Sequence, residues 1–443
     1  MNQKRAALVT LGCKVNWYDS QAMAESLKAA GFILVVEGEP ADVYIVNTCA
    51  VTAEAERKSR QTVRKMLRLH PSAAVIAVGC STQKDPQAYA AMDGLAAVSG
   101  MERGVVASLA ERAAEGERGM MEQAAPAFFF EELPADTQQG HTRAVLKIED
   151  GCDAHCAYCV IPDLRGEPRS RSLSSIRREA EVLAARGFQE IVLVGINLGR
   201  YGVGLSEPSA LAGAVEAATL PGIARIRLGS LEPDAVNATL LDHLSSVPQF
   251  CPHFHLSLQS GCAETLRRMG RRYNPTQFME KLRLIRDRWP DAGITTDVIV
   301  GFPGETDQEF AESCAFVAAA GFLKVHVFPY SRREGTRAAE MAGQLPKAVK
   351  EARAAAMQAA AAPGAQVSLN RMIGKTVPVL FEEPAAGRPG WLRGYAANYV
   401  DVIAPAGGIK AGEIAPVRLQ EAEGEAIIGI ISQPAAKEEF TNA

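Results

Sequence analysis

The sequence lacks long apolar runs and an excess of positive charge. No apolar run approaches the roughly 18 residues of a transmembrane helix, so we expect no membrane contact. Lys4 and Arg5 precede an apolar run at the lower length limit of a secretory signal, and we expect a cytoplasmic protein. Because the formal net charge is −4, composition gives no overall sign of nucleic-acid binding, and any such role must rest on local patches.

Cysteine is the residue type that carries most information. Nine cysteines in a chain expected to be cytoplasmic favour metal or redox chemistry over disulfides. Cys152, Cys156 and Cys159 form a C-x3-C-x2-C pattern, with Tyr158 before the last thiol. Four thiolates saturate a [4Fe–4S] cube, so three leave one iron open for an outside ligand. A structural zinc site is the alternative, but zinc sites usually show paired spacings and four ligands.

The N-terminal third predicts an open parallel α/β domain. Short apolar strands are expected over 6–10, 43–46 and 74–78, with helices over 19–30 and 54–70. Each of the three strands is followed closely by a cysteine, namely Cys13, Cys49 and Cys80. The carboxyl ends of parallel strands converge on one crevice, so these thiols should meet. Each alone could be a buried core cysteine. Three at equivalent strand ends favour a second three-cysteine cluster.

From Thr142 onward, strands and helices alternate and predict a (β/α) barrel or partial barrel. The strands are expected over 144–148, 190–194, 225–229, 253–258, 294–300 and 324–328, and the helices over 174–186, 208–218, 240–245, 275–288 and 307–319. In such barrels the chemistry lies at the carboxyl ends of the strands, and the C-x3-C-x2-C loop follows the first strand. An Ala-rich helical connector over 346–362 is expected to end at Pro363-Gly364.

Five short β segments follow, over 376–381, 391–396, 400–404, 414–419 and 426–432, and they predict a small β-barrel. The fold class is therefore α/β with three parts. We expect an N-terminal cluster-binding domain over 1–125, a central barrel domain over 138–366 and a C-terminal barrel over 371–435.

Several motifs together resemble the radical S-adenosylmethionine (radical SAM) methylthiotransferases. They are Thr10-Leu11-Gly12-Cys13-Lys14-Val15-Asn16, Asn47-Thr48-Cys49, Gly79-Cys80, the C-x3-C-x2-C loop, 228–233, 255–261 and 296–306. The resemblance covers nearly the whole chain. It implies a cluster-binding N-terminal domain, a radical SAM partial TIM barrel and a C-terminal TRAM domain that binds RNA.

The resemblance also implies the cofactors and their ligands. One [4Fe–4S] cluster would be held by Cys152, Cys156 and Cys159, with S-adenosylmethionine (SAM) on its open iron. A second would be held by Cys13, Cys49 and Cys80 and would carry the sulfur that is methylated and transferred. Carbon 2 of adenine is unactivated, so the reaction needs a 5′-deoxyadenosyl radical that no side chain can supply.

Contacts to SAM are expected from polar residues near the carboxyl ends of barrel strands: Ser230, Glu232, Ser257 and Gln259. Tyr158 is expected near the adenine. Asp297 and Glu305 flank another strand end. For each of these the alternative is an ordinary polar residue at the barrel mouth.

Two segments resemble the branch that modifies N6-threonylcarbamoyladenosine beside the tRNA anticodon. They are 11–16 and Phe328-Pro329-Tyr330-Ser331-Arg332-Arg333-Glu334-Gly335-Thr336. Arg332 and Arg333 are candidates for binding the threonylcarbamoyl carboxylate, because a guanidinium offers it two parallel hydrogen bonds. Contacts to tRNA phosphates are their alternative role.

The resemblance leaves other activities open. The same family methylthiolates isopentenyladenosine in tRNA or an aspartate of a ribosomal protein. A non-catalytic iron–sulfur protein that binds RNA or transfers electrons is an alternative of another class, although an electron carrier normally has four ligands per cluster. The expected partners are tRNA and a reducing protein such as flavodoxin or ferredoxin.

Three basic runs, in 54–70, 165–178 and 267–272, are candidates for phosphate contacts, with solvated charged faces as the alternative. The C-terminal barrel is not basic, so its RNA role would depend on stacking by Trp391, Tyr395 or Tyr399. The chain departs from the family pattern at Trp17, where Gln is usual, and at Cys262, where Ser is usual.

Overall fold

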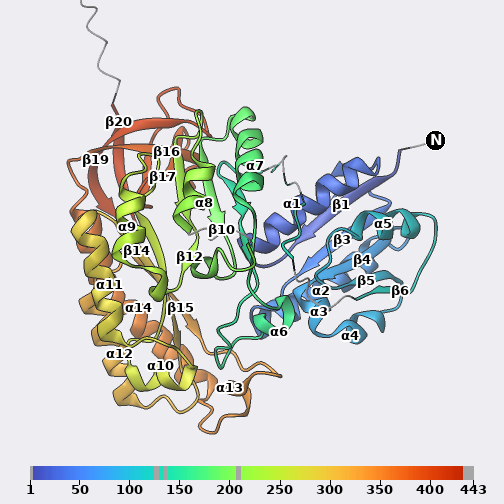
Figure 1. The fold of residues 1–443 in the computed structure, drawn as a ribbon, viewed down its shortest axis with the longest axis horizontal. Helices are drawn as coiled ribbons and strands as arrows, with labels where there is room; N and C mark the ends of the chain where they lie inside the picture. Colours follow the sequence, from blue (N-terminus) through green and yellow to red (C-terminus); the bar gives the residue numbers. More distant parts are fainter. Residues whose placement is uncertain are drawn as a thin grey trace, which may run out of the picture.

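The N-terminal part of the computed structural model is an open parallel sheet with strand order β2-β1-β3-β4-β5-β6 (Figure 1). The structure describes residues 3–123, 129–133, 135, 138, 140–205 and 211–432. The strands are β1 (Arg5–Thr10), β2 (Ile33–Val35), β3 (Val43–Thr48), β4 (Ala74–Gly79), β5 (Leu95–Ser99) and β6 (Met120–Glu122). The helices are α1 (Lys14–Ala29), α2 (Ala53–Leu69), α3 (Cys80–Lys84), α4 (Pro86–Ala90) and α5 (Val106–Ala114).

Strands β3 and β4 are buried along their whole length, because helices cover both faces of the sheet. Their sequences are accordingly almost continuous apolar runs rather than alternating ones. The two strands pair in parallel from Val43–Ala74 to Thr48–Gly79, which places their carboxyl ends side by side. Strand β1 lies on the other side of β3, with Thr10 opposite Asn47. The ends of β1, β3 and β4 therefore form one edge.

The central part is a curved parallel wall whose strands follow one another in chain order. They are β7 (Ala144–Lys147), β10 (Glu190–Val194), β11 (Arg225–Leu228), β12 (Ser230–Leu231), β13 (His253–Gln259), β14 (Gly293–Val300) and β15 (Lys324–Pro329). They form two sheets, β11-β10-β7 and β12-β13-β14-β15, and only Gly229 separates β11 from β12 along the chain. The outer helices are α7 (Leu173–Ala185), α8 (Leu211–Ala218), α9 (Ala238–Ser245), α11 (Pro275–Arg288) and α12 (Asp307–Ala320).

The core of this part lies between the wall and its helices. Buried apolar side chains from β7, β10, β13 and β14 pack there against those of α7, α8, α9 and α11. β15 is the edge strand of its sheet, and Phe328 on it remains 47% exposed. The wall is thus a partial barrel. Residues 208–210 of the helix expected over 208–218 lie outside the described residues.

The C-terminal part is a closed barrel with strand order β16-β17-β18-β20-β19. Its strands are β16 (Thr376–Pro384), β17 (Trp391–Ala396), β18 (Asp401–Pro405), β19 (Ile414–Glu423) and β20 (Ala426–Ile431). The predicted fold class is therefore confirmed, while the domain boundaries stay predictions. Among the described residues, no helix has the length and apolar character needed to cross a bilayer.

One predicted boundary is wrong. α14 (Lys347–Asn370) continues through Pro363 and Gly364, where the sequence predicted its end. Met357 and Leu369 are buried on either side of this point, so packing on both halves of the helix outweighs the local preference of Pro and Gly to end it.

Candidate active site

The three N-terminal cysteines lie at the shared edge of β1, β3 and β4. Cys13 precedes α1, Cys49 follows β3, and Cys80 begins α3. Gly12 has φ +109°, and a Cβ there would lie 2.8 Å from the Cys49 sulfur, so glycine allows the first loop to approach the second. Asn16 joins the loops, because its Nδ2 donates to the Leu11 and Thr48 carbonyls, each at 2.8 Å.

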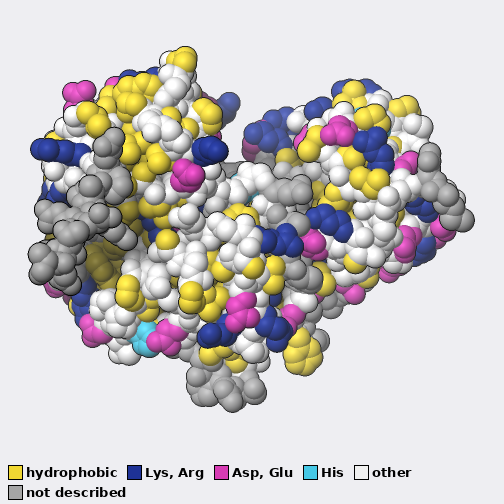
Figure 2. All heavy atoms as spheres, turned by 90° about the horizontal axis from the view of Figure 1, so that it is seen from above, with side chains coloured by type: hydrophobic (Ala, Val, Ile, Leu, Met, Phe, Trp, Pro, Cys, Tyr) yellow, Lys and Arg dark blue, Asp and Glu magenta, His cyan; other side chains and the backbone are white. Residues whose placement is uncertain are grey.

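These thiols open onto a cavity of about 730 Å³ that reaches the inside of the partial barrel. Its lining comes from all three parts of the chain: the cysteine loops, β11 to β15 and one residue of the C-terminal barrel, Tyr399. The cavity thus lies between the N-terminal sheet and the barrel wall. Figure 2 shows a hollow between these two parts of the surface, with Lys and Arg side chains on its rim.

The C-x3-C-x2-C loop follows the short strand β8 (Glu149–Asp150) and precedes α6 (Ile161–Arg165). Donors surround its sulfurs: the Ala154 N–H lies 3.4 Å from Cys152, and the Ile161 N–H lies 3.5 Å from Cys159. Nη1 of Arg271 donates to the Cys156 sulfur at 3.1 Å. Hydrogen bonds to sulfur are a feature of thiolate-held iron–sulfur sites, where they tune the potential.

The two sets of thiols have the chemistry that a cluster needs. Burial raises the pKa of Cys49 and of Cys159 to about 11, so each thiol stays protonated at neutral pH unless a metal replaces the proton. Within the described residues, no three His, Cys, Asp or Glu side chains are arranged around a single metal ion. A cube does not require that arrangement, because each of its cysteines binds a different iron.

The residues expected to contact SAM lie near the ends of neighbouring strands. Ser230 on β12 lines the cavity and pairs with His255 of β13. Ser257 and Gln259 lie in the last three residues of strand β13, and Gln259 has φ +64°. Glu232 is ion-paired with Arg271, the residue that also donates to Cys156. Their roles toward SAM stay predictions.

Two other predicted residues have well-defined surroundings. The Tyr158 ring packs edge-on against Phe302, with 6.5 Å between ring centroids. Glu305 does not line the cavity described above. Its carboxylate accepts from the Gly301 N–H at 2.7 Å and from Arg353 at 2.7 Å, which indicates a structural role.

Arg332 and Arg333 differ sharply. Arg332 is exposed, and its Nε donates to the Ala339 carbonyl at 2.9 Å. Arg333 is only 5% exposed, and its Nη1 donates to the carbonyl of Val51, two residues after Cys49. Burial lowers the pKa of Arg333, and the negative groups around it, Cys159, Glu56, Cys49 and Cys80, oppose this effect. Among described residues, its Nε and Nη2 have no hydrogen-bond partner.

A group of histidines on the cavity wall was missed in the sequence. His253, His255 and His326 line it together with Asp297, and His255 Nε2 lies 3.2 Å from an Asp297 carboxylate oxygen. Thr295 Oγ1 lies 2.9 Å from His255 Nδ1. The sequence signal for this group was the alternation of His253 and His255 at the start of β13, since residues two apart in a strand share one face.

The interpretation of 165–178 as a phosphate-binding run is wrong for its first half. Arg165, Arg169 and Arg171 are each less than 5% exposed and are paired with buried carboxylates, so tRNA cannot reach them. In the run 267–272, Arg271 is likewise occupied by Glu232. In α2, by contrast, Arg64, Lys65 and Arg68 are exposed.

The two departures from the family pattern lie outside the cavity lining. The Trp17 ring packs edge-on against His141 with 4.3 Å between centroids. The buried Cys262 thiol lies 3.2 Å from a Glu312 carboxylate oxygen. Neither side chain is among those that line the cavity.

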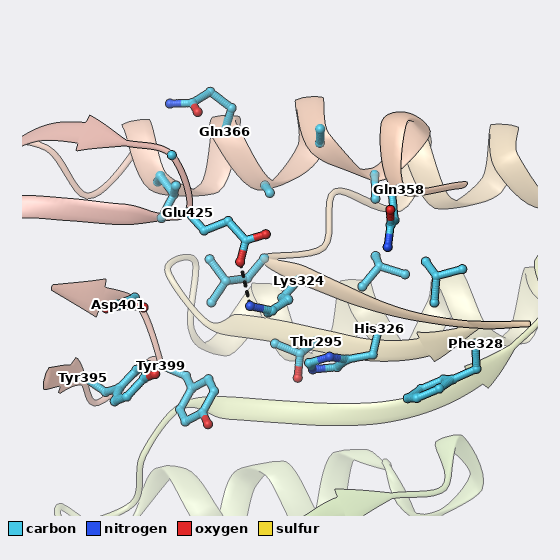
Figure 3. A pocket seen from close by; sticks show the side chains of 18 residues that line it. Thr295, Lys324, His326, Phe328, Gln358, Gln366, Tyr395, Tyr399, Asp401 and Glu425 are labelled. Carbon is cyan, nitrogen blue, oxygen red and sulfur yellow. Dashed lines mark hydrogen bonds and ion pairs between the residues drawn. The ribbon is translucent and has the colours of Figure 1, made fainter. Parts of the chain in front are cut away.

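A second cavity, of about 800 Å³, lies between β15, α14 and the C-terminal barrel (Figure 3). It shares Thr295, His326, Phe328 and Tyr399 with the first, so the two adjoin along the open edge of the partial barrel. The Tyr395 and Tyr399 rings stack with 4.8 Å between centroids. Lys324 and Glu425 form an ion pair across the opening.

Comparison with known proteins agrees with this arrangement. Residues 5–100 match a family described as "Uncharacterized protein family UPF0004", and residues 146–317 match the radical SAM superfamily. The chain is 35% identical to "Threonylcarbamoyladenosine tRNA methylthiotransferase MtaB" of Chlamydia pneumoniae, over 96% of this chain and 97% of that protein. The chain belongs to the radical SAM methylthiotransferase family. Because members of this family are enzymes, the alternative of a non-catalytic iron–sulfur protein is set aside.

Other members of the methylthiotransferase family are similarly close. The chain is 38% identical to "Ribosomal protein uS12 methylthiotransferase RimO" of Desulforudis audaxviator, over 85% of each chain. It is 34% identical to "tRNA-2-methylthio-N(6)-dimethylallyladenosine synthase" of Acidothermus cellulolyticus, over 84% of this chain and 76% of that protein. The solved radical SAM methyltransferase TsrM from Kitasatospora setae shares the fold, with TM-score 0.53 and 15% identity over 76% of this chain and 77% of that one.

Proposed function

We propose that this methylthiotransferase transfers a methylthio group to carbon 2 of N6-threonylcarbamoyladenosine beside the tRNA anticodon. The observation that carries the substrate choice is the buried guanidinium of Arg333. Its Nε and Nη2 lie on one edge of the planar group and have no partner among the described residues, while Nη1 is fixed on the Val51 carbonyl. Such an edge binds a carboxylate through two parallel hydrogen bonds. The threonylcarbamoyl group has a carboxylate, and the isopentenyl group has none.

The six cysteines are the proposed cluster ligands. Cys152, Cys156 and Cys159 would hold the cluster that binds SAM, and Cys13, Cys49 and Cys80 would hold the second. When bound, the clusters and SAM supply the electron, the radical and the sulfur that side chains cannot. The chain's own contribution is to line the cavity with Cys13, Cys49 and Cys80. A SAM-binding cluster within reach of the same substrate would favour reaction by proximity.

The walls of the cavity suit a nucleobase. His253, His255, His326 and Asp297 offer hydrogen-bonding groups on one side, and Phe328 offers an exposed ring on the edge strand. Bases in unpaired loops are bound by stacking and by contacts to their edges. The adjoining second cavity would admit the anticodon loop past Tyr395. The Tyr399 ring is stacked on the rings of His253 and Tyr395, so it would support Tyr395 rather than stack on a base itself. tRNA and a reducing protein such as flavodoxin or ferredoxin are the proposed partners.

A nucleoside analysis of tRNA tests the substrate. In a strain that lacks this gene, mass spectrometry should show threonylcarbamoyladenosine without its 2-methylthio group, and the gene should restore it. Loss of the methylthio group from isopentenyladenosine instead would reassign the branch. Normal tRNA with an unmodified ribosomal aspartate would favour the activity named for the ribosomal-protein relative.

Iron analysis tests the ligand assignment. The reconstituted protein should bind about eight irons, because each of two cubes holds four. Replacing Cys152, Cys156 and Cys159 by Ala should remove about half of the iron and all SAM cleavage. Replacing Cys13, Cys49 and Cys80 should remove the other half but leave SAM cleavage. Full iron content in the second variant would exclude those three thiols as ligands.

A further inference from the structure

A buried group of charges joins the N-terminal sheet to the partial barrel, next to the N-terminal cysteines. Its centre is Asp19 of α1 and Asp150 of β8, and both are at most 3% exposed. Four cations contact them: Arg103, Lys147, Arg165 and Arg169. We call these six residues the charge cluster. All four cations are at most 6% exposed.

The contacts are short and cross between the two parts of the chain. Arg165 donates to Asp150 at 2.8 Å and to Asp19 at 3.1 Å. Lys147 lies 2.5 Å from Asp19 and 3.2 Å from Asp150. Arg103 lies 2.8 Å from Asp19 and 3.3 Å from Asp150. Three cations contact Asp19 and four contact Asp150, so both carboxylates are held in ion pairs.

The charges in the cluster do not balance. Among the described residues, four cations face these two carboxylates, and one further carboxylate, that of Glu131, contacts Arg103 at 3.1 Å. Glu149 lies beside Asp150 in sequence, but its carboxyl group accepts from the Asn197 N–H at 2.7 Å and lies outside the ion pairs of the cluster. At least one positive charge therefore remains without a carboxylate. A buried charge without a counter-charge is costly, so an anion is expected next to it.

Arg165 is the cation that faces the N-terminal cysteines. It lines the cavity together with Cys13, Cys49 and Cys80. Its Nη2 donates at 2.9 Å to Oδ1 of Asn16, the atom that also lies 3.7 Å from the Cys80 sulfur. Among the described residues, the buried Nε of Arg165 has no partner.

We propose that Arg165, held by Asp19 and Asp150, is a positioning residue that compensates the negative charge of the cluster on Cys13, Cys49 and Cys80. This rests on the proposed function, because it requires the second cluster. Three thiolates on the cube supply the missing negative charge. The cluster becomes more negative when it is reduced, so a neighbouring cation stabilises the reduced state and raises the reduction potential.

The test isolates the N-terminal cluster in the full-length chain. Cys152, Cys156 and Cys159 are replaced by Ala, and the midpoint potential is measured with and without R165Q. We expect R165Q to shift the equilibrium toward the oxidised cluster by about tenfold, which is about 59 mV for one electron. R165K keeps the charge and should restore at least half of the shift. Three cations remain for Asp19 and Asp150 in R165Q, so neither carboxylate is left without an ion-pair partner.

R103Q is the matched control, because Arg103 donates to Asp19, Asp150 and Glu131 rather than to a group that contacts a cysteine. R103Q also removes one positive charge, but from a residue that contacts only the carboxylates, so it should shift the midpoint potential less than R165Q does. An unchanged potential in R165Q, an equal shift in R165K or R103Q, or loss of iron from both R165Q and R165K would overturn the proposal. If the chain with Arg165 intact binds no iron in this background, the second cluster itself is wrong, and the proposed function fails separately.

Discussion

At the scale of single residues, Gly12 tests how the first two cysteine loops meet. G12A would place a methyl group 2.8 Å from the Cys49 sulfur and would strain a backbone with φ +109°. We expect the reconstituted variant to lose about half of its iron, since one of two cubes is affected, and to keep SAM cleavage.

G31A is a control that distinguishes the effect of backbone strain from the effect of a steric contact with Cys49. Gly31 has φ +87°, and a Cβ there would meet nothing within 4 Å. G31A should lower the stability by about 1–2 kcal/mol through backbone strain alone and should keep all of its iron. Equal iron loss in both variants would mean that the fit of Gly12 against Cys49 does not matter for the cluster.

Arg333 and Arg332 form a matched pair for substrate selection. R333A removes a buried guanidinium with a free edge, whereas R332A removes an exposed one. We expect R333A to lower methylthiolation of threonylcarbamoyladenosine by about 10–100-fold, the range for a charge-assisted contact of about 1.5–3 kcal/mol, with little change in tRNA affinity. Rates on threonylcarbamoyl and isopentenyl tRNA, measured side by side, give the selectivity. Equal losses on both substrates would assign Arg333 to SAM or to a cluster instead.

Residue type and spacing were enough to predict which cysteines group together, because thiols at strand ends and in a C-x3-C-x2-C loop leave few alternatives. The arginines were harder. Arg165 and Arg177 belong to one basic run, yet Arg165 is buried against Asp150 and Arg177 lies on the exposed face of α7. A run of charges gives no information about which members face carboxylates from distant segments. The same is true of His255 and Asp297, which meet only after β13 and β14 pair.

At the scale of elements, α14 shows where local preference fails. Gly364 is buried at the crossing of α14 with the end of α12, and a Cβ there would lie 2.9 Å from the Gly321 Cα. Ala is the better helix former by about 1 kcal/mol, so propensity alone predicts that G364A stabilises. We expect the opposite, a loss of about 1–3 kcal/mol, because a backbone contact cannot move aside as a side chain can.

Chemical denaturation of G364A measures this balance, and A356G on the exposed face of the same helix measures propensity alone. A more stable G364A would show that the helix and Gly321 can separate without cost. The sequence could not give this result, because Pro363-Gly364 is a reasonable helix end when the neighbouring Gly321 is unknown. The barrel strands, in contrast, were predicted well, since Gly and Pro clusters separate them in the sequence.

At the scale of the whole molecule, two buried arginines attach the C-terminal barrel to the wall of the partial barrel. Arg225 donates to the carbonyls of Tyr395 at 2.9 Å and Pro378 at 2.6 Å. Arg227 donates to the Ala397 carbonyl at 2.9 Å and to Glu190 at 2.7 Å. These contacts fix Tyr395 beside the second cavity and Tyr399 beside both cavities. The position of the barrel thus depends on its backbone carbonyls as well as on ion pairs such as Arg143–Glu382 and Lys375–Asp291.

Replacing Arg225 by Met should loosen this attachment without leaving Glu190 unpaired, because Arg227 still binds it. Hydrogen exchange should rise in β16 and β17, whose carbonyls lose their donors, and tRNA affinity should fall several-fold. SAM cleavage without tRNA should persist, because the C-x3-C-x2-C loop makes its contacts to Arg271 and Asn197 elsewhere. Faster exchange with unchanged tRNA affinity would assign recognition to exposed cations such as Arg64 and Lys65 of α2, and the C-terminal barrel would then have no part in RNA binding.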